Sequence, residues 1–475
     1  MLDEVIGEGG AFSKSIMNLA ASIQRQRALF QTGATRPLAF RRARLRELEN
    51  AVGSHEQALL EALYADLRKP PHEAFGSEIG LVHAELRHAL RHLPSWMARR
   101  RRPVPWLAWP GRGFVEPEPY GVALILGPWN YPVQLLLAPL IGALAAGNCV
   151  VLKPSEFAPR TAAALARLIE AIYPEDYVTV VQGERETAEA LLCERFDAIF
   201  FTGSTAVGRS VMAAAARHLT PVTLELGGKS PCIVCADAPL DTTARRIAWG
   251  KFLNAGQTCV APDFVLVDRR VRDGLLEALQ RAVRAFYGLD PRKSPDYARI
   301  VNRRHIDRLA GYLQSGKPIE GGRWDAQDLY FAPTILTDVT PDAPVMQDEV
   351  FGPILPVLEF DRLENALEML RERPTPLALY VFTPDRSTQE RVLKGTRSGG
   401  VCINDTLTHI VGSGLPFGGL GESGLGAYHG RASFDCFSHS RSVLRRSLAI
   451  DPALRYPPPR ISLAAFKRAS RFLFG

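Results

Sequence analysis

Short apolar segments alternate with amphipathic segments of helical periodicity from residue 122 to residue 218. Apolar strands separated by helices of this length are typical of a parallel sheet that helices cover on both faces. The alternation therefore predicts an α/β fold, whose ligands bind at the carboxyl ends of the strands. The expected strands cover residues 122–126, 149–152, 178–181 and 197–201, and the expected helices cover residues 133–146, 160–172, 187–193 and 205–218.

Two further regions flank this one. Residues 12–98 carry leucine and alanine at helical spacing, which predicts amphipathic helices. Residues 102–119 are rich in proline, which indicates a protruding hairpin or linker. Beyond Leu226 a second α/β region begins, with strands expected at 232–235, 264–267, 354–360, 377–382 and 401–403, and helices at 241–253, 271–286, 363–372 and 387–394.

Length and composition limit the class of protein. A chain of 475 residues with 46% hydrophobic and 23% charged residues is expected to be soluble and globular, with two or three domains. The net charge of +7 is a mild excess that favours anionic cofactors without implying nucleic acid. The densest basic run, residues 99–102, follows an expected helix around 83–98, and we interpret it as a solvated helix end.

The seven cysteines are scattered and odd in number, which argues against a disulfide framework and favours a reducing compartment. Cys232 and Cys235 have CxxC spacing, but they lie in an apolar run without a second such pair, so we expect no metal site. No signal architecture opens the chain, and the longest apolar stretch, 135–147, is too short to span a bilayer. We therefore expect a cytoplasmic protein.

The stretch from Asn254 to Cys259 places one thiol in a loop of small residues, just before a hydrophobic run. Such a thiol can be exposed enough to react and held rigidly enough to be oriented. Most single free cysteines are small buried hydrophobes, so this spacing alone leaves a catalytic and a structural role open.

Residues 203–208 join an expected strand to an expected helix and begin and end with glycine. Glycine lets the backbone approach a phosphate, and a helix N-terminus offers free N–H groups, although an ordinary turn also has this pattern. The segment nearly matches a P-loop, but Arg209 stands at the position of the lysine. This difference counts against a nucleoside triphosphatase, which is the rival enzyme class.

Polar side chains follow two other expected strands. Lys153 and Glu156 can hold the ribose hydroxyls of a dinucleotide, or they can mark the capped start of a surface helix. Asn130 stands among stiff proline and aromatic neighbours, where its amide can donate to an oxyanion or cap the next helix.

Two acidic residues are candidates for the same site. Glu225 ends an alternating segment beside two glycines, where partial burial would raise its pKa and suit a general base. A structural salt bridge is the commoner role for such a residue. Glu349 lies near Phe351, a pair that can contact a ribose and a flat ring. The glycine-rich segment 415–426 lacks a strand–loop–helix context, and we expect irregular backbone close to the site.

Taken together, the segments 127–132, 153–156, 201–208, 224–229, 254–259 and 349–353 resemble the aldehyde dehydrogenase superfamily, and they occur in the family's order. The resemblance runs from about residue 20 to about residue 445. The segments 398–405, 415–419 and 426–430 are similar to its class 3 branch, and within that branch the chain resembles bacterial coniferyl aldehyde dehydrogenases.

The resemblance implies a Rossmann-type parallel-sheet cofactor domain and an α/β catalytic domain, with a small β element for bridging and oligomerisation. In that element the hairpin would pair with a C-terminal strand around 433–444 and join two subunits. The implied boundaries are 1–102 and 119–226 for the cofactor domain, 227–428 for the catalytic domain, 103–118 and 429–448 for the bridging element, and 449–475 for a C-terminal tail.

The resemblance also implies the chemistry of the site. Cys259 would attack the aldehyde carbonyl, while the Asn130 amide and the Cys259 N–H would stabilise the oxyanion. Glu225 would activate the water that releases the acid. NAD is the expected hydride acceptor, because a carboxylate at position 156 would repel the 2′-phosphate of NADP. NADP stays possible as an alternative cofactor. The implied cofactor contacts are Trp129, Lys153, Glu156, Gly203, Ser204, Gly208, Glu349 and Phe351.

We therefore expect a homodimeric NAD(P)-dependent enzyme that oxidises an aromatic aldehyde such as coniferaldehyde, or a medium-to-long aliphatic aldehyde. The alternative is a fatty aldehyde dehydrogenase with a membrane-surface tail, because residues 460–475 interleave apolar and basic side chains as a short amphipathic helix would. A non-catalytic protein that kept the fold is the rival from another class.

Overall fold

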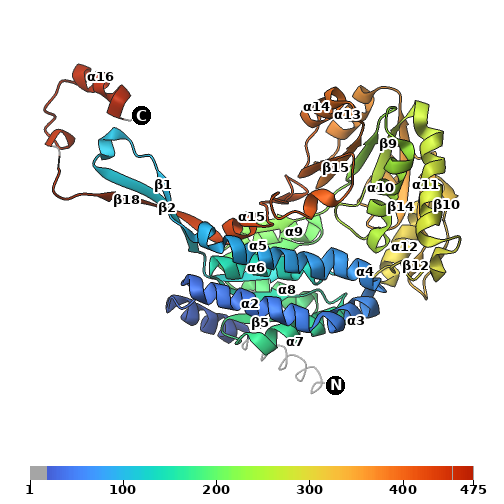
Figure 1. Ribbon diagram of the computed structural model, residues 1–475, viewed down its shortest axis with the longest axis horizontal. Coiled ribbons are helices and arrows are strands. Elements are labelled where there is room, and N and C mark those ends of the chain that lie inside the picture. The colour runs from blue at the N-terminus through green and yellow to red at the C-terminus, as the bar shows by residue number, and fades with distance from the viewer. Residues whose placement is uncertain (1–18, 452, 474–475) are drawn as a thin grey trace, which may run out of the picture.

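The computed structural model describes residues 19–451 and 453–473, and it confirms the expected α/β fold (Figure 1). The described chain contains two large sheets flanked by helices and a smaller sheet that projects from the body. Residues 12–18 of the expected N-terminal helices lie outside the described residues.

The first large sheet has six strands in the order β17-β7-β6-β3-β4-β5. All pairs are parallel except that β17 runs antiparallel to β7. Since β3 pairs with both β4 and β6, the chain order reverses at β3, and the loops after β3 and β6 lie where such sheets bind ligands. The strands are β3 (Val122–Leu126), β4 (Cys149–Lys153), β5 (Val178–Val180), β6 (Ala198–Thr202), β7 (Val222–Glu225) and β17 (Gly424–Leu425).

Helices on this sheet come from two parts of the chain. The crossover helices are α6 (Gln134–Ala146), α7 (Pro159–Ile172), α8 (Arg185–Cys193) and α9 (Thr205–Ala216). The N-terminal helices pack on α6 and α7, so that every residue of α6 is buried. They include a helix over residues 19–31 together with α2 (Leu38–Ser54), α3 (Glu56–Leu67), α4 (Pro71–Ala74) and α5 (Gly80–Met97), with a π-helical turn at Phe75–Ile79 that the periodicity did not predict.

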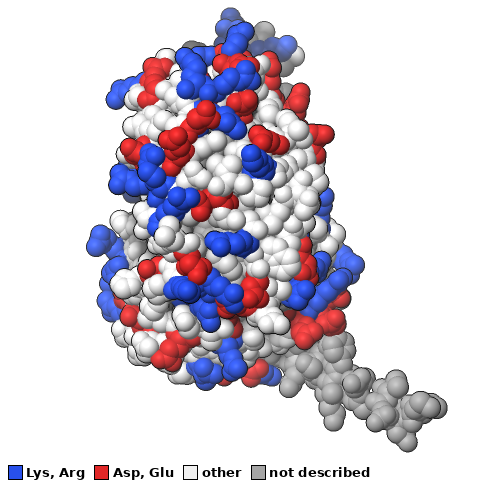
Figure 2. Space-filling view, turned by 90° about the vertical axis from the view of Figure 1, so that its right-hand side faces the viewer, with Lys and Arg blue, Asp and Glu red and all other residues white. Residues whose placement is uncertain are grey.

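The second large sheet has seven strands in the order β10-β13-β14-β9-β8-β15-β16. Its strands are β8 (Pro231–Val234), β9 (Phe264–Asp268), β10 (Lys317–Glu320), β13 (Thr334–Thr337), β14 (Ile354–Phe360), β15 (Ala378–Phe382) and β16 (Gly400–Ile403). Its helices are α10 (Leu240–Phe252), α11 (Arg272–Tyr287), α12 (Arg303–Tyr312), α13 (Leu363–Arg371) and α14 (Arg386–Gly395). A short hairpin of β11 (Trp324–Asp325) and β12 (Tyr330–Phe331) lies beside it. Figure 2 shows acidic and basic side chains interspersed on this side of the molecule.

The small sheet forms an arm that extends away from the body (Figure 1). It consists of β1 (Arg100–Arg102), β2 (Gly111–Pro119) and β18 (Ser438–Arg446) in the order β1-β2-β18. The interpretation of the basic run as a helix end was wrong, because α5 ends at Met97 and the arginines pair with β2. The C-terminal strand lies later than expected, because α15 (Arg431–Cys436) occupies the first third of 433–444 and β18 begins at Ser438.

A short helix, α16 (Leu463–Leu473), follows the arm and confirms the helix expected in the tail. It contacts the tip of the arm at Trp106–Ala108. Within the described part of the chain, no helix combines the length and hydrophobicity needed to cross a membrane.

Candidate active site

The loop that carries Cys259 is tightly folded where α10 ends. Asn254, Ala255 and Gly256 have positive φ angles of 52°, 51° and 75°. Such angles are unfavourable for residues other than glycine, and a Cβ at Gly256 would collide with the carbonyl oxygen of Gly352. The backbone before the sulfur is therefore held against a loop that lies far away in the sequence.

Cys259 is half-buried and borders two cavities. The larger cavity, of about 630 Å³, is also lined by Asn130 and Glu225. The smaller cavity, of about 290 Å³, is lined mainly by apolar and aromatic side chains. Among the described residues, Cys259 is the one that lines both cavities.

The surroundings of Cys259 disfavour the thiolate form of its side chain. Burial raises its pKa well above the ordinary value, and the nearby carboxylates of Glu349 and Glu225 raise it further. A reaction at this sulfur therefore needs an added positive charge or a proton acceptor, since the thiolate is the nucleophilic form.

Asn130 lies in the loop after β3 and is 3% exposed. Its carbonyl oxygen accepts hydrogen bonds from Lys69 Nζ at 2.9 Å and from Asn254 Nδ2 at 2.8 Å. Its side-chain Nδ2 donates to the carbonyl oxygen of Gln257 at 3.0 Å. One amide hydrogen thus holds the loop of Cys259, and the second is left for a group bound in the cavity.

Glu225 is the last residue of β7 and is 2% exposed. Neither carboxylate oxygen has a hydrogen-bond partner in the described structure, and the salt bridge that the sequence left open is not formed there. Burial raises the pKa of this carboxyl well above its ordinary value. A buried carboxyl without partners costs stability, and such groups cluster at functional sites.

The turn between β6 and α9 lies against the same strand end. Gly203 N donates to the carbonyl oxygen of Glu225 at 3.0 Å, and Ser204 is the N-cap of α9. Both residues line the larger cavity. Gly208 lies outside its lining, and a Cβ there would meet the side chain of Leu226 at 2.6 Å. This glycine therefore allows α9 to pack closely on the sheet.

Glu349, Phe351 and Trp129 all line the larger cavity. The rings of Trp129 and Phe351 pack edge to face, with their centroids 5.3 Å apart. Burial raises the pKa of Glu349 to about 8, and a Cβ at Gly227 would collide with its carboxylate. This side of the cavity therefore offers a flat aromatic surface next to an acidic group.

Lys153 and Glu156 lie outside the linings of both cavities. They form an ion pair with Nζ and Oε2 2.7 Å apart, in which the side chain of Lys153 is 6% exposed and that of Glu156 is 28% exposed. The pair follows β4, the neighbour of β3, so it lies along the same edge of the sheet as the loop of Asn130.

The sequence patterns missed a buried ion pair behind Asn130. Lys69 and Glu78 are both 0% exposed, with Nζ and Oε1 2.5 Å apart. Glu78 Oε2 accepts the N–H of Val133 at 2.8 Å, and Lys69 Nζ lies 4.1 Å from the centroid of the Tyr131 ring. The π-helical turn that contains Glu78 is the one local signal, because such turns are frequent at functional sites.

Two other charged residues near the site, the half-buried Glu73 and the buried Lys251, were also missed. Glu73 Oε1 accepts the N–H of Asn254 at 2.8 Å, and burial raises the pKa of Glu73 to about 7. Lys251 is fully buried without a hydrogen-bond partner among the described residues, and burial lowers its pKa to about 8. Isolated charged residues in the sequence give no signal of such burial, because their surroundings come from distant segments.

The apolar cavity has walls from several separate segments, so no motif predicted it. The buried polar side chains of Gln134, Thr258 and His429 interrupt the apolar wall, and burial lowers the pKa of His429 to about 4. The apolar and aromatic lining includes Leu135, Trp249, Leu253, Ile410, Phe417 and Tyr428.

Cys232 and Cys235 are both free thiols, the first buried and the second half-buried at the end of β8. In residues 19–451 and 453–473, no group of three or more His, Cys, Asp or Glu side chains is placed to hold a metal ion.

Comparisons with known proteins agree with this geometry. The profile of the "Aldehyde dehydrogenase family" matches residues 4–443. The chain is 46% identical to "Aldehyde dehydrogenase, dimeric NADP-preferring" of Canis lupus familiaris, over 94% of this chain and 98% of that protein. It is 47% identical to "Aldehyde dehydrogenase family 3 member B1" of Homo sapiens, over 93% and 94% of the two chains.

A bacterial relative and a solved structure extend the likeness. The chain is 44% identical to "4,4'-diaponeurosporen-aldehyde dehydrogenase" of Staphylococcus aureus, over 91% of this chain and 95% of that protein. The substrate-bound structure of Staphylococcus aureus AldH superposes with a TM-score of 0.93 at 42% identity, covering 95% of this chain and 99% of the other. These matches exclude the nucleoside triphosphatase. The matched residues include those that line both cavities beside Cys259. The chain belongs to the aldehyde dehydrogenase family.

Proposed function

We propose that this chain oxidises an apolar aldehyde to the carboxylic acid, with NAD or NADP as the hydride acceptor and Cys259 as the nucleophile. The observation that carries the proposal is the position of Cys259 on the walls of both cavities. A sulfur in that place can meet an aldehyde in the apolar cavity while a dinucleotide occupies the larger one.

The larger cavity has features that fit a nicotinamide dinucleotide. Thr205 and Ala206, the first residues of α9, line it, and the first N–H groups of a helix lack partners within the helix. Together with Gly203 and Ser204 they form a cradle for the pyrophosphate at the positive end of the helix dipole. Arg209 also lines the cavity, where it forms an ion pair with Glu422 at 2.8 Å.

We assign the other expected contacts as follows. Trp129 and Phe351 would flank the nicotinamide, and Glu349 would accept hydrogen bonds from its ribose. Lys153 and Glu156 would reach the adenosine ribose. The Glu156 carboxylate disfavours a 2′-phosphate, but the Lys153 ammonium lies 2.7 Å from it and offsets part of that charge. We therefore propose NAD as the preferred cofactor, with NADP accepted.

When bound, the cofactor supplies a positive charge to the site and an acceptor for the hydride. That charge favours the thiolate of Cys259, whose pKa is raised by burial. The thiolate adds to the aldehyde carbon, and the carbonyl oxygen becomes an oxyanion. The free hydrogen of the Asn130 amide and the N–H of Cys259 then donate to this oxyanion.

Loss of the hydride converts the thiohemiacetal on Cys259 into a thioester. The raised pKa of Glu225 suits a general base, because its carboxylate binds a proton more readily than an exposed one. Glu225 takes a proton from a water molecule, the water oxygen adds to the thioester carbon, and the carbon–sulfur bond breaks. The carboxylic acid leaves and the sulfur regains a proton.

For the substrate we propose an aromatic aldehyde such as coniferaldehyde, with a fatty aldehyde as the alternative. The cavity of about 290 Å³ is lined by Trp249, Leu253, Ile410 and Phe417, which favour a hydrophobic substrate. The Staphylococcus aureus relative is named for a 4,4'-diaponeurosporen aldehyde, which also supports an apolar substrate.

We also propose a three-part organisation, in which residues 1–102 and 119–226 bind the cofactor, 227–428 carry the nucleophile, and 103–118 with 429–448 join two subunits. The projecting arm supports a homodimer, and one relative is named as dimeric. The free cysteines support a cytoplasmic location. Helix α16 exposes Leu463 beside basic residues, which supports weak contact with a membrane surface through 460–475.

A panel of aldehydes, each supplied with NAD and with NADP, tests the proposal. The purified protein should reduce the cofactor with coniferaldehyde and with medium-chain aldehydes, and it should release the acid. If no aldehyde reduces either cofactor, the protein is not the proposed enzyme and a non-catalytic role must be considered.

A further inference from the structure

The side chain of Gln257 is completely buried and fully hydrogen-bonded two residues before Cys259. Its Nε2 donates to the carbonyl oxygen of Arg299 at 2.9 Å and to that of Asn254 at 3.0 Å. Its Oε1 accepts the N–H of Val301 at 2.9 Å. Both hydrogens and the oxygen of this amide are therefore engaged, which sets its orientation.

The backbone carbonyl of Gln257 is engaged as well. It accepts hydrogen bonds from Asn130 Nδ2 at 3.0 Å and from Asn254 Nδ2 at 3.2 Å. A displacement of Gln257 would therefore move the Asn130 amide together with the loop of Cys259. The residue links the two groups that must meet the aldehyde carbonyl at the same time.

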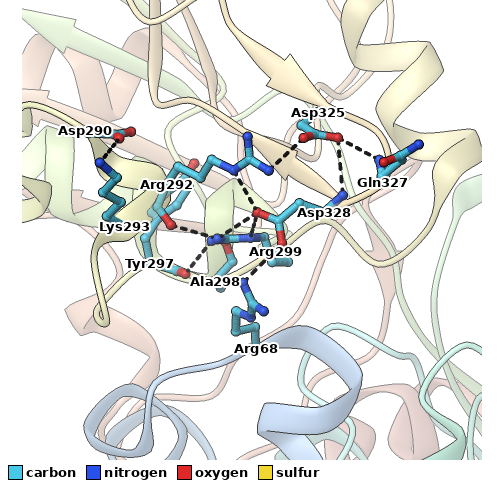
Figure 3. A network of polar contacts seen from close by, with 10 residues as sticks. All are labelled: Arg68, Asp290, Arg292, Lys293, Tyr297, Ala298, Arg299, Asp325, Gln327 and Asp328. Atoms are coloured by element: carbon cyan, nitrogen blue, oxygen red, sulfur yellow. Dashed lines mark hydrogen bonds and ion pairs between the residues drawn. The ribbon is translucent and has the colours of Figure 1, made fainter.

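The segment that receives the Gln257 side chain is held by the ionic network in Figure 3. The side chain of Arg299 is 6% exposed, and its Nη2 lies 3.1 Å from Asp328 Oδ2 and 2.9 Å from the carbonyl oxygen of Arg292. The backbone N–H of Arg299 donates to the carbonyl oxygen of Leu67 at 2.8 Å. Asp328 also pairs with Arg68 at 3.1 Å, so the segment is tied to the end of α3.

We infer that Gln257 is a positioning residue that aligns the oxyanion-binding amide of Asn130 with the sulfur of Cys259, and that the Arg299–Asp328 ion pair holds the segment on which Gln257 rests. The inference rests on the proposed roles of Asn130 and Cys259. It assigns a function to a glutamine that touches neither cavity.

The variant Gln257→Glu tests the alignment with almost no change of shape. It replaces the donating NH₂ group by an oxygen that faces the carbonyl oxygens of Arg299 and Asn254, so at least one of the two hydrogen bonds is lost. Since small misplacement of reacting groups costs on the order of 100-fold in rate, the burst of cofactor reduction should slow by about 10- to 100-fold. The affinity for the cofactor should not change.

A double-mutant cycle with Asn130→Ala separates positioning from a general loss of stability. If Gln257 acts through the Asn130 amide, Gln257→Glu should slow the burst by only about twofold in the Asn130→Ala background, because coupled residues are not additive. Equal costs in both backgrounds would overturn the inference. A general weakening of the fold would instead produce additive losses.

If Gln257→Glu does not fold, the variant Arg299→Lys provides a second test of the inference. A lysine keeps the charge but loses the fork that reaches Asp328 and Arg292, so a burst slowed several-fold at unchanged cofactor affinity is expected. The matched control is Arg303→Gln, which breaks an exposed ion pair with Asp307 of 2.9 Å and should behave as wild type. If Arg299→Lys lowers only the unfolding temperature, the network is structural and the inference fails.

Mass spectrometry of the wild-type protein, quenched during turnover, distinguishes a failure of the positioning role of Gln257 from a failure of the proposed function. An acyl adduct on Cys259 together with an additive cycle would refute only the positioning role of Gln257. The absence of any adduct would refute the proposed function itself.

Discussion

The substitution Glu225→Gln should leave the first turnover fast and make every later turnover slow. The change replaces a buried carboxyl, whose two oxygens have no partner among the described residues, by an amide of nearly the same shape. The amide cannot take a proton from water, but the sulfur of Cys259 and the amide of Asn130 stay in place. Acylation should therefore proceed, and the thioester should accumulate.

The size of the kinetic effect follows from the role of the base. General base catalysis contributes about 10²- to 10⁴-fold, so kcat should fall by at least about 100-fold. A stopped-flow trace of reduced cofactor should show a burst close to one equivalent per Cys259, followed by a slow linear phase. The exposed variant Glu359→Gln, which removes a surface partner of Arg269, is the matched control.

Stability should change in the opposite direction to activity. A buried group left without partners costs about 1–3 kcal/mol, and more when it is charged. At about 2.1 cal/mol/K per residue, a chain of 475 residues loses or gains about 1 °C in Tm for each kcal/mol. The Gln amide is equally unpaired, so the substitution removes only the added cost of the charged form, and the Gln variant should melt higher at the pH values where Glu225 ionises.

The difference in melting temperature between the wild-type protein and Glu225→Gln should depend on pH in a defined direction. The folded pKa of Glu225 is raised, so its contribution to stability is fully present below the ordinary glutamate pKa of about 4.3 and is lost as pH rises through the folded pKa. The advantage of Glu225→Gln should thus be absent in acid and grow towards alkaline pH. An unchanged steady-state rate, or an advantage that shrinks as pH rises, would refute this account of Glu225.

The other predictions concern the nucleophile, the tail and the buried ion pair. Cys259→Ala should abolish turnover while fluorescence titration still shows tight cofactor binding; substantial remaining activity would point to another nucleophile. Alkylation of Cys259 in the empty enzyme should be slow at neutral pH and accelerate as pH rises, because the pKa of the thiol is raised, and NAD should accelerate it at neutral pH; a rate independent of both would contradict the burial argument. Deletion of residues 457–475 should leave turnover unchanged and reduce binding to anionic vesicles in a flotation assay; equal binding would discard the membrane contact. Lys69→Met should lower the free energy of unfolding by about 3–5 kcal/mol in a denaturant titration, because it leaves Glu78 buried without its partner; a loss below about 1 kcal/mol would show that Glu78 finds water.

Much of the fold could be predicted because strands buried on both faces form continuous apolar runs. The strands β3 and β14 lie within the ranges expected for them. Helix α12 was missed because arginine, histidine and aspartate dominate it, and its buried side chains are only Ile306, Leu309 and Tyr312. The arginines of β1 misled the prediction because this strand is largely exposed at the edge of the arm, where it pairs with β2 without an apolar run to mark it.

The motifs located several residues that line the larger cavity: Asn130, Gly203 and Glu225 lie at or just after the carboxyl ends of strands, Cys259 lies in the tight loop after α10, and Glu349 lies before β14. They missed the groups that hold those residues. Lys69, Glu73 and Gln257 act through contacts with backbone atoms of other segments, and such contacts leave no spacing in the sequence. Tertiary structure alone shows which charged residues are buried.

Cys259 lines both cavities, and their other lining residues differ. Substitutions in the apolar cavity, at Trp249 or Leu253 for example, can therefore alter which molecules enter it without changing the lining of the larger cavity. Natural selection can therefore diversify the lining of the apolar cavity while the larger cavity stays unchanged. A protein engineer can do the same.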